Sequence, residues 1–177
     1  NEIGDLAAAV RMARNDIRRM SDVLEAAPLC EPERSVPGNP DAPAVELDSV
    51  HFAYRTGEPV LCGIDLAVPR RSVVALVGPS GSGKTTVTRL IARFYDVDSG
   101  SVRVGGVDVR EQTTADLMAQ LSLVFQDVYL FDDTLRANVR VGRLDATDAE
   151  VAEAAYTAGV QEIVDRLPGG WDTRVGE

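Results

Sequence analysis

Residues 78–86 combine glycines, hydroxyl side chains and one lysine in a pattern that suits phosphate binding. They are Gly78, Pro79, Ser80, Gly81, Ser82, Gly83, Lys84, Thr85 and Thr86. A glycine, four residues and then Gly-Lys-Ser/Thr is the spacing of the phosphate-binding loop of nucleoside-triphosphate enzymes. The glycines let the backbone approach phosphate oxygens closely. We expect Lys84 to reach the β- and γ-phosphates of a nucleotide, and the Thr85 hydroxyl to bind Mg²⁺.

The segments on either side of this loop predict the elements that position it. Residues 73–77 form a short apolar run rich in β-branched side chains, which is typical of a central parallel strand. Apolar residues at helical spacing predict a helix over 85–95. Such a helix turns free N–H groups and a positive dipole end toward the loop. A glycine-rich turn without a ligand is the alternative, which the flanking strand and helix disfavour.

An antiparallel region is expected before the loop. Apolar residues alternate over 45–54, and the alternation changes phase at Asp48 and Ser49, which predicts a strand with a bulge or turn there. Residues 60–68 predict a second strand after a turn. In many kinases and small GTPases the phosphate loop instead follows the first strand, so this order is a distinguishing feature.

After the loop helix the sequence predicts a hairpin and a second buried strand. Gly105 and Gly106 separate two short β-type runs, as in a two-residue hairpin turn. Residues 121–125 are apolar and predict a second strand covered on both faces, which ends at Gln126.

The remaining residues predict short helices. The expected ranges are 117–120, 134–141, 148–158 and 161–167. Thr147 is followed by Glu150 at the spacing of a capping box, and Gly159 suits the position just after a helix.

The N-terminal part of the chain predicts a helix and a linker. Apolar residues over 1–27 follow a heptad-like spacing. That helix either packs on its own domain or is the end of a longer helix from outside the chain, and we favour the second interpretation. Prolines punctuate residues 28–43, which predicts an extended, semi-rigid linker and the first domain boundary.

Composition limits the possible functions. The chain has 177 residues, a net charge of −10 and a pI of about 4.6, which argues against a nucleic-acid partner. The sequence has no apolar run long enough to span a membrane and no signal-peptide pattern. Cys30 and Cys62 show no metal-ligand spacing, so we expect reduced thiols, and their role is not indicated.

These motifs together resemble the nucleotide-binding domain of exporter-type ATP-binding-cassette (ABC) transporters. Tyr54 stands where that family carries an aromatic side chain that stacks on adenine, and Gln126 matches its Q-loop glutamine. Residues 126–139 are similar to the segment after the Q-loop of exporter cassettes. Residues 171–177 are similar to the loop before the signature motif, which in exporters contacts the coupling helices.

The resemblance implies a fold and a domain organisation. The fold is α/β, with a P-loop NTPase core, an antiparallel β-subdomain and part of the helical subdomain. Residues 1–27 correspond to the cytoplasmic end of the last transmembrane-domain helix, 28–43 to the linker, and 44–177 to an incomplete nucleotide-binding domain. The implied location is the cytoplasmic face of the cell membrane.

The resemblance also implies roles for residues. ATP phosphates are expected on the loop 78–86, Mg²⁺ on Thr85 and Gln126, and the base on Tyr54. Lys84 and Gln126 are the expected catalytic residues. The implied partners are the chain's own transmembrane domain, through its coupling helices, and a second nucleotide-binding domain in a homodimer or heterodimer.

One departure from the family pattern lies at the end of the chain. The sequence stops at Glu177, before the family's signature motif, its Walker B carboxylates and its switch histidine. His51 precedes the loop, so we expect it to be an exposed or half-buried strand residue and not that switch. We expect the 177 residues alone to be inactive as an ATPase and poorly stable.

The predicted function is therefore ATP binding in a transporter subunit that couples ATP binding and hydrolysis to transport. Two rival hypotheses are a soluble P-loop phosphoryl-transfer enzyme and a non-transport ABC clamp. The antiparallel region before the loop disfavours the first, and the negative net charge disfavours a nucleic-acid-linked form of the second. The transported substrate and its direction are not encoded in these motifs.

Overall fold

The computed structural model describes residues 14, 20–21, 24, 28–127 and 129–176. Most of the helix predicted over 1–27 lies outside the described residues. The chain divides into two compact units, Asn1–Ser122 and Leu123–Glu177.

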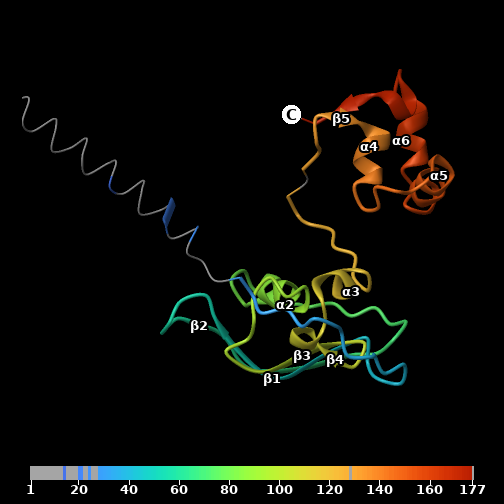
Figure 1. The fold of residues 1–177 in the computed structure, drawn as a ribbon. Helices are drawn as coiled ribbons and strands as arrows, with labels where there is room; N and C mark the ends of the chain where they lie inside the picture. The colour runs from blue at the N-terminus through green and yellow to red at the C-terminus, as the bar shows by residue number, and fades with distance from the viewer. Residues whose placement is uncertain (1–13, 15–19, 22–23, 25–27, 128, 177) are drawn as a thin grey trace, which may run out of the picture. The chain divides into compact units, whose positions relative to one another are not determined.

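The first unit is built on a four-stranded antiparallel sheet (Figure 1). Its strands are β1 (Val45–Ala53), β2 (Pro59–Val68), β3 (Ser99–Val104) and β4 (Val107–Asp108), in the order β2-β1-β3-β4. The antiparallel region predicted before the loop is confirmed by the pairing of β1 with β2. The predicted hairpin is also confirmed, because Val104 pairs with Val107 across Gly105 and Gly106.

The expected irregularity in β1 is present. The pairing of β1 with β2 changes register between Leu47 and Val50, and Ser49 has a φ of 48°. Leu47 and Val50 are both buried, so the extra residue keeps two apolar side chains on the core side of one strand.

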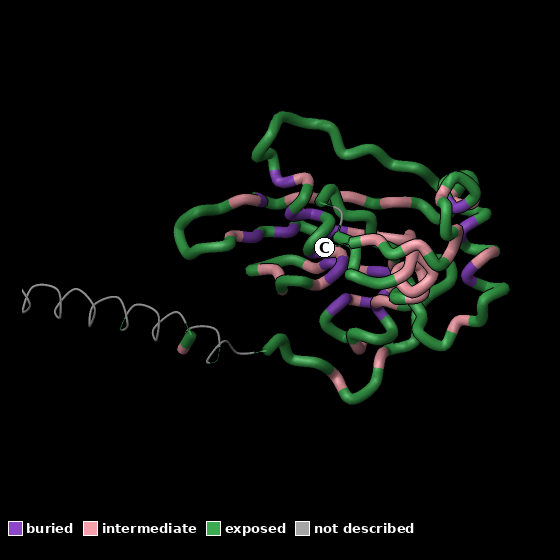
Figure 2. Tube along the Cα trace, turned by 90° about the horizontal axis from the view of Figure 1, so that it is seen from above, coloured by how far each residue is buried: buried purple, intermediate pink, exposed green. Residues whose placement is uncertain are grey.

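Helices α2 (Lys84–Ile91) and α3 (Thr114–Met118) cover one face of this sheet, and the 3₁₀ turn η1 (Val109–Glu111) follows β4 (Figure 1). The buried stretches of this unit follow the strands and the helices that cover them (Figure 2). The apolar core joins residues from β1, β2, α2, β3, η1 and α3: Leu47, Val50, Phe52, Leu61, Val87, Leu90, Val102, Val104, Val109 and Leu117. The phosphate-loop helix is therefore anchored to the sheet by its own apolar face.

Helix α2 ends four residues earlier than the sequence predicts. Arg93 has a φ of 52° and lies just after the helix C-cap at Ala92. The Arg93 N–H donates to the carbonyl of Leu90, and the Phe94 N–H donates to the carbonyl of Arg89. These paired bonds form a Schellman motif, which stops the helix.

The side chain of Arg93 explains why a residue other than glycine occupies this left-handed position. This side chain is 7% exposed, and its guanidinium forms an ion pair with Asp96 at 3.0 Å. It also donates hydrogen bonds to the carbonyl oxygens of Cys30, at 2.5 Å, and Gln112, at 3.5 Å. Charge-assisted bonds of this kind offset the cost of a left-handed backbone, about 1–2 kcal/mol.

The linker 28–43 has no helix or strand, and it lies along the first unit. The Val36 N–H donates to the carbonyl of Glu111 at 3.1 Å, and the Asn39 N–H donates to the carbonyl of Gly105 at 2.9 Å. The linker is therefore held against η1 and the β3–β4 turn by its own backbone.

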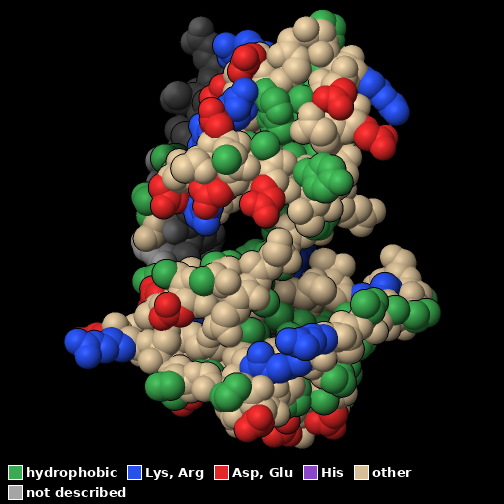
Figure 3. All heavy atoms as spheres, turned by 90° about the vertical axis from the view of Figure 1, so that its right-hand side faces the viewer, with side chains coloured by type: hydrophobic (Ala, Val, Ile, Leu, Met, Phe, Trp, Pro, Cys, Tyr) green, Lys and Arg blue, Asp and Glu red, His purple; other side chains and the backbone are tan. Residues whose placement is uncertain are grey.

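The prediction of buried strands over 73–77 and 121–125 is wrong for this structure. Neither segment forms a strand, and Val73, Val77 and Val124 are more than nine-tenths exposed. Figure 3 shows hydrophobic side chains at the surface of the molecule. The physical reason is pairing: a strand forms only where its N–H and C=O groups find a partner. No strand in the described part of the chain pairs with either segment.

The second unit is mainly helical. Its elements are β5 (Asp133–Thr134), α4 (Leu135–Arg140), α5 (Asp148–Thr157), α6 (Gln161–Arg166), η2 (Gly170–Asp172) and β6 (Arg174–Val175), with β5 and β6 paired antiparallel. The helices predicted over 134–141, 148–158 and 161–167 are confirmed to within a few residues. The helix predicted over 117–120 corresponds to α3 of the first unit, which begins earlier, at Thr114. Within the described residues, no helix is long and apolar enough to cross a membrane.

The ends of α5 match their sequence signals. The Thr147 side chain accepts a hydrogen bond from the Glu150 N–H, and the Glu150 carboxylate accepts from the Thr147 N–H at 2.9 Å. This capping box, with Arg143 beside it, holds the pKa of Glu150 at about 2, below its ordinary value of 4.5. Gly159 follows the helix with a φ of 71°, which confirms the predicted C-terminal glycine.

Candidate functional site

The phosphate loop joins the segment after β2 to the N-terminus of α2, and packing requires glycine at Gly83, the last position before the helix. A side chain at Gly83 would come within 2.6 Å of Leu61 Cδ2 on β2, and the φ of Gly83 is 86°. A side chain at Gly78 would come within 2.8 Å of Ser82 Oγ. The absence of a side chain at Gly83 lets α2 begin directly against the sheet, and the space at Gly78 is taken by the Ser82 side chain.

The Lys84 ammonium lies over the loop backbone. Its Nζ donates hydrogen bonds to the carbonyl oxygens of Gly78, at 2.9 Å, and Pro79, at 2.6 Å, and to Ser82 Oγ at 3.3 Å. The ammonium of Lys84, the only charged group of the loop, is therefore held against the backbone of the same loop.

The N-terminus of α2 adds a second source of positive potential. No side chain caps it, and its first helical bond runs from the Val87 N–H to the Gly83 carbonyl. The N–H groups of the first turn precede that bond, and the positive end of the helix dipole lies there. Thr85 is exposed in this turn, whereas Thr86 is buried. Together with Lys84, this arrangement suits a chain of phosphate oxygens.

The side chain of Tyr54 is hydrogen-bonded to the same helix, α2. Its hydroxyl donates to Thr86 Oγ1 at 3.2 Å and accepts from Arg89 Nη1 at 3.3 Å. Burial acts to raise the pKa of Tyr54, but the hydrogen bonds with Thr86 and Arg89 outweigh it, so the pKa lies below its ordinary value. The hydroxyl of Tyr54, the predicted base-contacting residue, is therefore hydrogen-bonded to two residues of α2.

Tyr54 belongs to a small aromatic cluster. Its ring lies 4.9 Å from that of Phe52 and 5.1 Å from that of Tyr95, and both pairs are close to perpendicular, at 85°. Neither neighbour is stacked parallel to Tyr54, which is 41% exposed as a residue. Sequence reasoning missed Tyr95 and Arg89 as neighbours of Tyr54. A basic residue on α2 and an aromatic residue just after it were the available signals.

Gln126 lies in the second unit, in a bend after residues 121–125, and it is exposed. Contacts within the first unit bring together the loop, Lys84, Thr85, Thr86 and Tyr54, but they do not include Gln126. The predicted metal-binding pair of Thr85 and Gln126 therefore stays a prediction.

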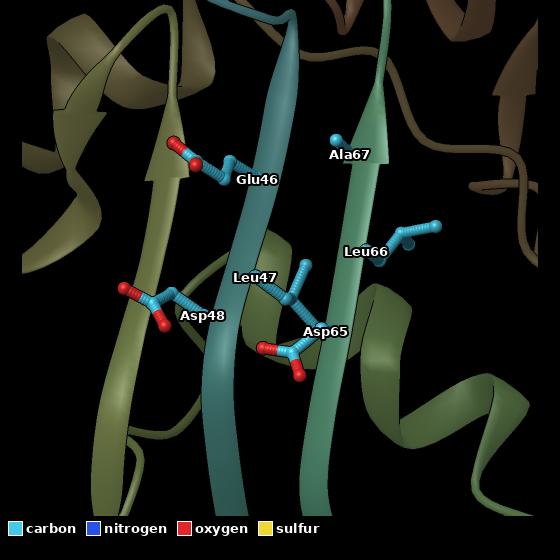
Figure 4. Close-up of a pocket in the computed structure, with 6 residues that line it drawn as sticks. All are labelled: Glu46, Leu47, Asp48, Asp65, Leu66 and Ala67. Atoms are coloured by element: carbon cyan, nitrogen blue, oxygen red, sulfur yellow. The ribbon is translucent and has the colours of Figure 1, made fainter.

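A shallow acidic hollow on the sheet lies between β1 and β2 and contains none of the predicted site residues (Figure 4). Its carboxylates come from Glu46, Asp48 and Asp65, and they are engaged locally. Arg103 Nη1 lies 3.3 Å from Glu46 and 3.9 Å from Asp48, and the Asp65 carboxylate accepts from the Ser49 N–H at 2.7 Å. The negative charge of this hollow disfavours the binding of phosphate groups there.

Cysteine and histidine residues do not form a second centre. Cys30 and Cys62 are free and exposed thiols, as predicted. His51 is an exposed residue of β1, also as predicted, and its Nδ1 lies 3.0 Å from the Ser49 carbonyl oxygen. Within the described parts of the chain, no group of three or more His, Cys, Asp or Glu side chains is placed to hold a metal ion.

Known proteins provide an independent comparison, and residues 61–176 match the ABC transporter family. The chain belongs to this family. An uncharacterised ABC transporter ATP-binding protein, YfiC of Bacillus subtilis, is 38% identical over 98% of the chain and 28% of its own length. A fatty acid ABC transporter ATP-binding/permease protein of Mycobacterium tuberculosis is 37% identical over 99% of the chain and 28% of its own length.

A solved structure gives the same result for the fold of this ABC family member. A bacterial Atm1-family ABC exporter with ATP bound superposes with a TM-score of 0.80 at 36% identity, over 99% of the chain and 31% of the exporter chain. Human ATP-binding cassette sub-family B member 6 is 42% identical over 75% of the chain and 16% of its own length. The chain therefore spans less than a third of each of these relatives.

These comparisons confirm the predicted family and the α/β fold class with its P-loop core. Membership of the family implies ATP binding. The relatives carry names of ABC transporter proteins, which does not favour the soluble phosphoryl-transfer enzyme or the non-transport clamp.

Proposed function

We propose that this chain is the ATP-binding part of an ABC transporter subunit, in which ATP binding and hydrolysis drive substrate transport across a membrane. The observation that carries the proposal is the position of the Lys84 ammonium. It lies on the carbonyls of Gly78 and Pro79, beside the uncapped N-terminus of α2.

The loop binds the phosphates of ATP through backbone and side chain together. Backbone N–H groups of the loop and of the first turn of α2 would donate to the phosphate oxygens, and the helix dipole favours their negative charge. The Lys84 ammonium exchanges its carbonyl acceptors for β- and γ-phosphate oxygens, which form stronger, charge-assisted hydrogen bonds. It also stabilises charge that develops on the transferred phosphoryl group, which is the catalytic role proposed for it.

The hydroxyl of Thr85 suits a magnesium ion beside these phosphates. Mg²⁺ prefers hard oxygen ligands, keeps several waters and is bound through few protein groups. The exposed hydroxyl of Thr85, next to Lys84, would provide one such ligand, and we propose the side-chain oxygen of Gln126 as the second. When bound, Mg²⁺ neutralises charge on the β- and γ-phosphate oxygens. Gln126 would also orient the attacking water, which is its proposed catalytic role.

Tyr54 is proposed to bind the adenine. A partly exposed aromatic ring, attached to the helix that begins at the phosphate loop, suits a base whose phosphates lie on that loop. Stacking of a base on an aromatic ring contributes about 1–3 kcal/mol.

The proposed partners are a transmembrane domain and a second nucleotide-binding domain. The names of two relatives support this, because one is an ATP-binding/permease protein and another is an exporter. In this proposal residues 1–27 end the last transmembrane helix, 28–43 link it to the cassette, and the cassette lies at the cytoplasmic face of the membrane. ATP bound between two cassettes closes them, and hydrolysis allows them to open.

Reconstitution of the full-length protein in lipid vesicles tests this function. ATP hydrolysis that requires Mg²⁺ is expected, and Lys84→Ala is expected to abolish it. Arg166→Ala, which removes an exposed arginine of α6 paired with Glu162, is the matched control and should retain hydrolysis. Hydrolysis that persists in Lys84→Ala, or that needs no divalent cation, contradicts the proposal.

A further inference from the structure

The hydroxyl of Tyr54 is held by two residues of one helix. Thr86 Oγ1 accepts from it at 3.2 Å, and Arg89 Nη1 donates to it at 3.3 Å. Residues three apart lie on the same face of a helix, so Thr86 and Arg89 approach the hydroxyl from consecutive turns. Arg89 is exposed, is not part of the phosphate-loop motif and does not belong to the apolar core.

We propose that Arg89 is a positioning residue for Tyr54. By its hydrogen bond to the tyrosine hydroxyl, Arg89 orients the aromatic ring toward the nucleotide base and so affects how tightly the base is bound. This inference rests on the proposed function, because it assigns Tyr54 to the base. Arg89 acts through the tyrosine hydroxyl and does not itself contact the nucleotide.

The location of Tyr54 explains why its ring needs such an anchor. Tyr54 follows the last residue of β1, where the ladder of backbone hydrogen bonds ends. The Ala53 N–H donates to Asp98 Oδ2 at 2.8 Å, which fixes the backbone just before it. Tyr54 is 41% exposed, and its aromatic neighbours contact its ring at close to right angles. The hydroxyl bonds therefore add an orientation constraint that burial alone does not supply.

The position of Arg89 on α2 argues against a direct role at the phosphates. Phosphates are expected at the N-terminus of the helix, at Lys84, and Arg89 lies more than one turn further along. The guanidinium is instead directed to the phenol oxygen, and the pairing raises the pKa of Arg89 above its ordinary value. Its positive charge remains next to Tyr54 at all physiological pH values.

A double-mutant cycle in the full-length protein tests the proposal. Equilibrium affinities for ATP and for inorganic triphosphate, which has phosphates but no base, are measured for Arg89→Ala, Tyr54→Phe and the double variant. Arg89→Ala should weaken ATP binding by about 2- to 12-fold, the range for one net hydrogen bond. In the Tyr54→Phe background the same substitution should cause no further loss, because the hydroxyl through which Arg89 acts is absent. Affinity for triphosphate should not change.

Conservative and matched variants complete the test. Arg89→Lys should retain most of the ATP affinity, because an ammonium still donates to the hydroxyl, and Arg166→Ala should retain all of it. Alanine is a strong helix former, so Arg89→Ala should not unfold α2. An unchanged ATP affinity in Arg89→Ala overturns the proposal, as does an equal loss in the Tyr54→Phe background or for triphosphate. A failure of the proposed function would be recognised by a different result: the Lys84→Ala variant would then retain its affinity for both ATP and triphosphate.

Discussion

The hydroxyl of Tyr54 donates a hydrogen bond to Thr86 Oγ1 over 3.2 Å, between residues 32 positions apart in the chain. This bond joins the turn after β1 to Thr86, which is the last residue of the phosphate loop and lies in the first turn of α2. Because α2 also packs on the sheet through Val87 and Leu90, the proposed base and phosphate positions belong to one packed unit.

Substitutions at Tyr54 should separate the ring from the hydroxyl. We expect Tyr54→Ala to weaken ATP binding by roughly 5- to 150-fold, because a stack of about 1–3 kcal/mol is lost. Tyr54→Phe should cost less, about 2- to 12-fold, because the ring remains while its hydrogen bonds to α2 are lost. Titration with a fluorescent ATP analogue measures both. A Phe variant as weak as Ala would contradict a stacking contribution from the ring face.

The sequence predicted the elements whose signals are local. The capping box of Thr147 and Glu150, the hairpin at Gly105 and Gly106, and the break in β1 at Ser49 each depend on a few neighbouring residues, and each is confirmed. Local chemistry of this kind is nearly independent of the rest of the fold.

Features that depend on distant partners were not predicted. Residues 73–77 have the composition of a strand, but a strand requires a neighbour, and composition does not supply one. The early end of α2 depends on Arg93 meeting the carbonyls of Cys30 and Gln112. The bond between Arg89 and Tyr54 likewise joins two segments whose proximity no local pattern indicates. The phosphate loop was therefore predictable from local patterns, whereas the contacts of Tyr54 with α2 were not.

Gln126 provides a test of coupling between hydrolysis and transport. Gln126→Ala in the full-length protein should leave ATP binding mostly intact and lower transport and substrate-stimulated hydrolysis together. A coupling free energy of about 1–3 kcal/mol corresponds to a loss of roughly 5- to 150-fold. Parallel assays of nucleotide binding, hydrolysis and vesicle uptake measure it. Equal losses of binding and hydrolysis would make Gln126 an ordinary binding residue.

Arg93 should hold the linker against the first unit. Arg93→Ala removes the bond to the Cys30 carbonyl and the ion pair to Asp96, at an expected cost of about 1.5–3 kcal/mol. Trypsin cleavage after Arg34, which lies in the linker, should become faster in this variant. Arg166→Ala serves as the control. If the two variants are cleaved at Arg34 at the same rate, the linker is not held by Arg93.

The capping box of α5 should depend on pH. The folded-state pKa of Glu150, about 2, lies below its ordinary value of 4.5. Its stabilising contribution is therefore present above pH 4.5 and is lost as the pH falls through about 2. Hydrogen exchange of the α5 amides, compared with Glu150→Ala at the same pH, measures this contribution. The difference between the two proteins should be present at pH 7 and small near pH 2; a difference that is the same at both values contradicts the assignment.

Direct nucleotide binding tests the central claim, that residues 78–86 hold the phosphates of ATP through Lys84. Photolabelling of the full-length protein with an azido-ATP analogue should be strong, should compete with unlabelled ATP, and should be abolished by Lys84→Ala, because Lys84 is the only charged side chain in the loop. Undiminished labelling of the Lys84→Ala variant would contradict the account.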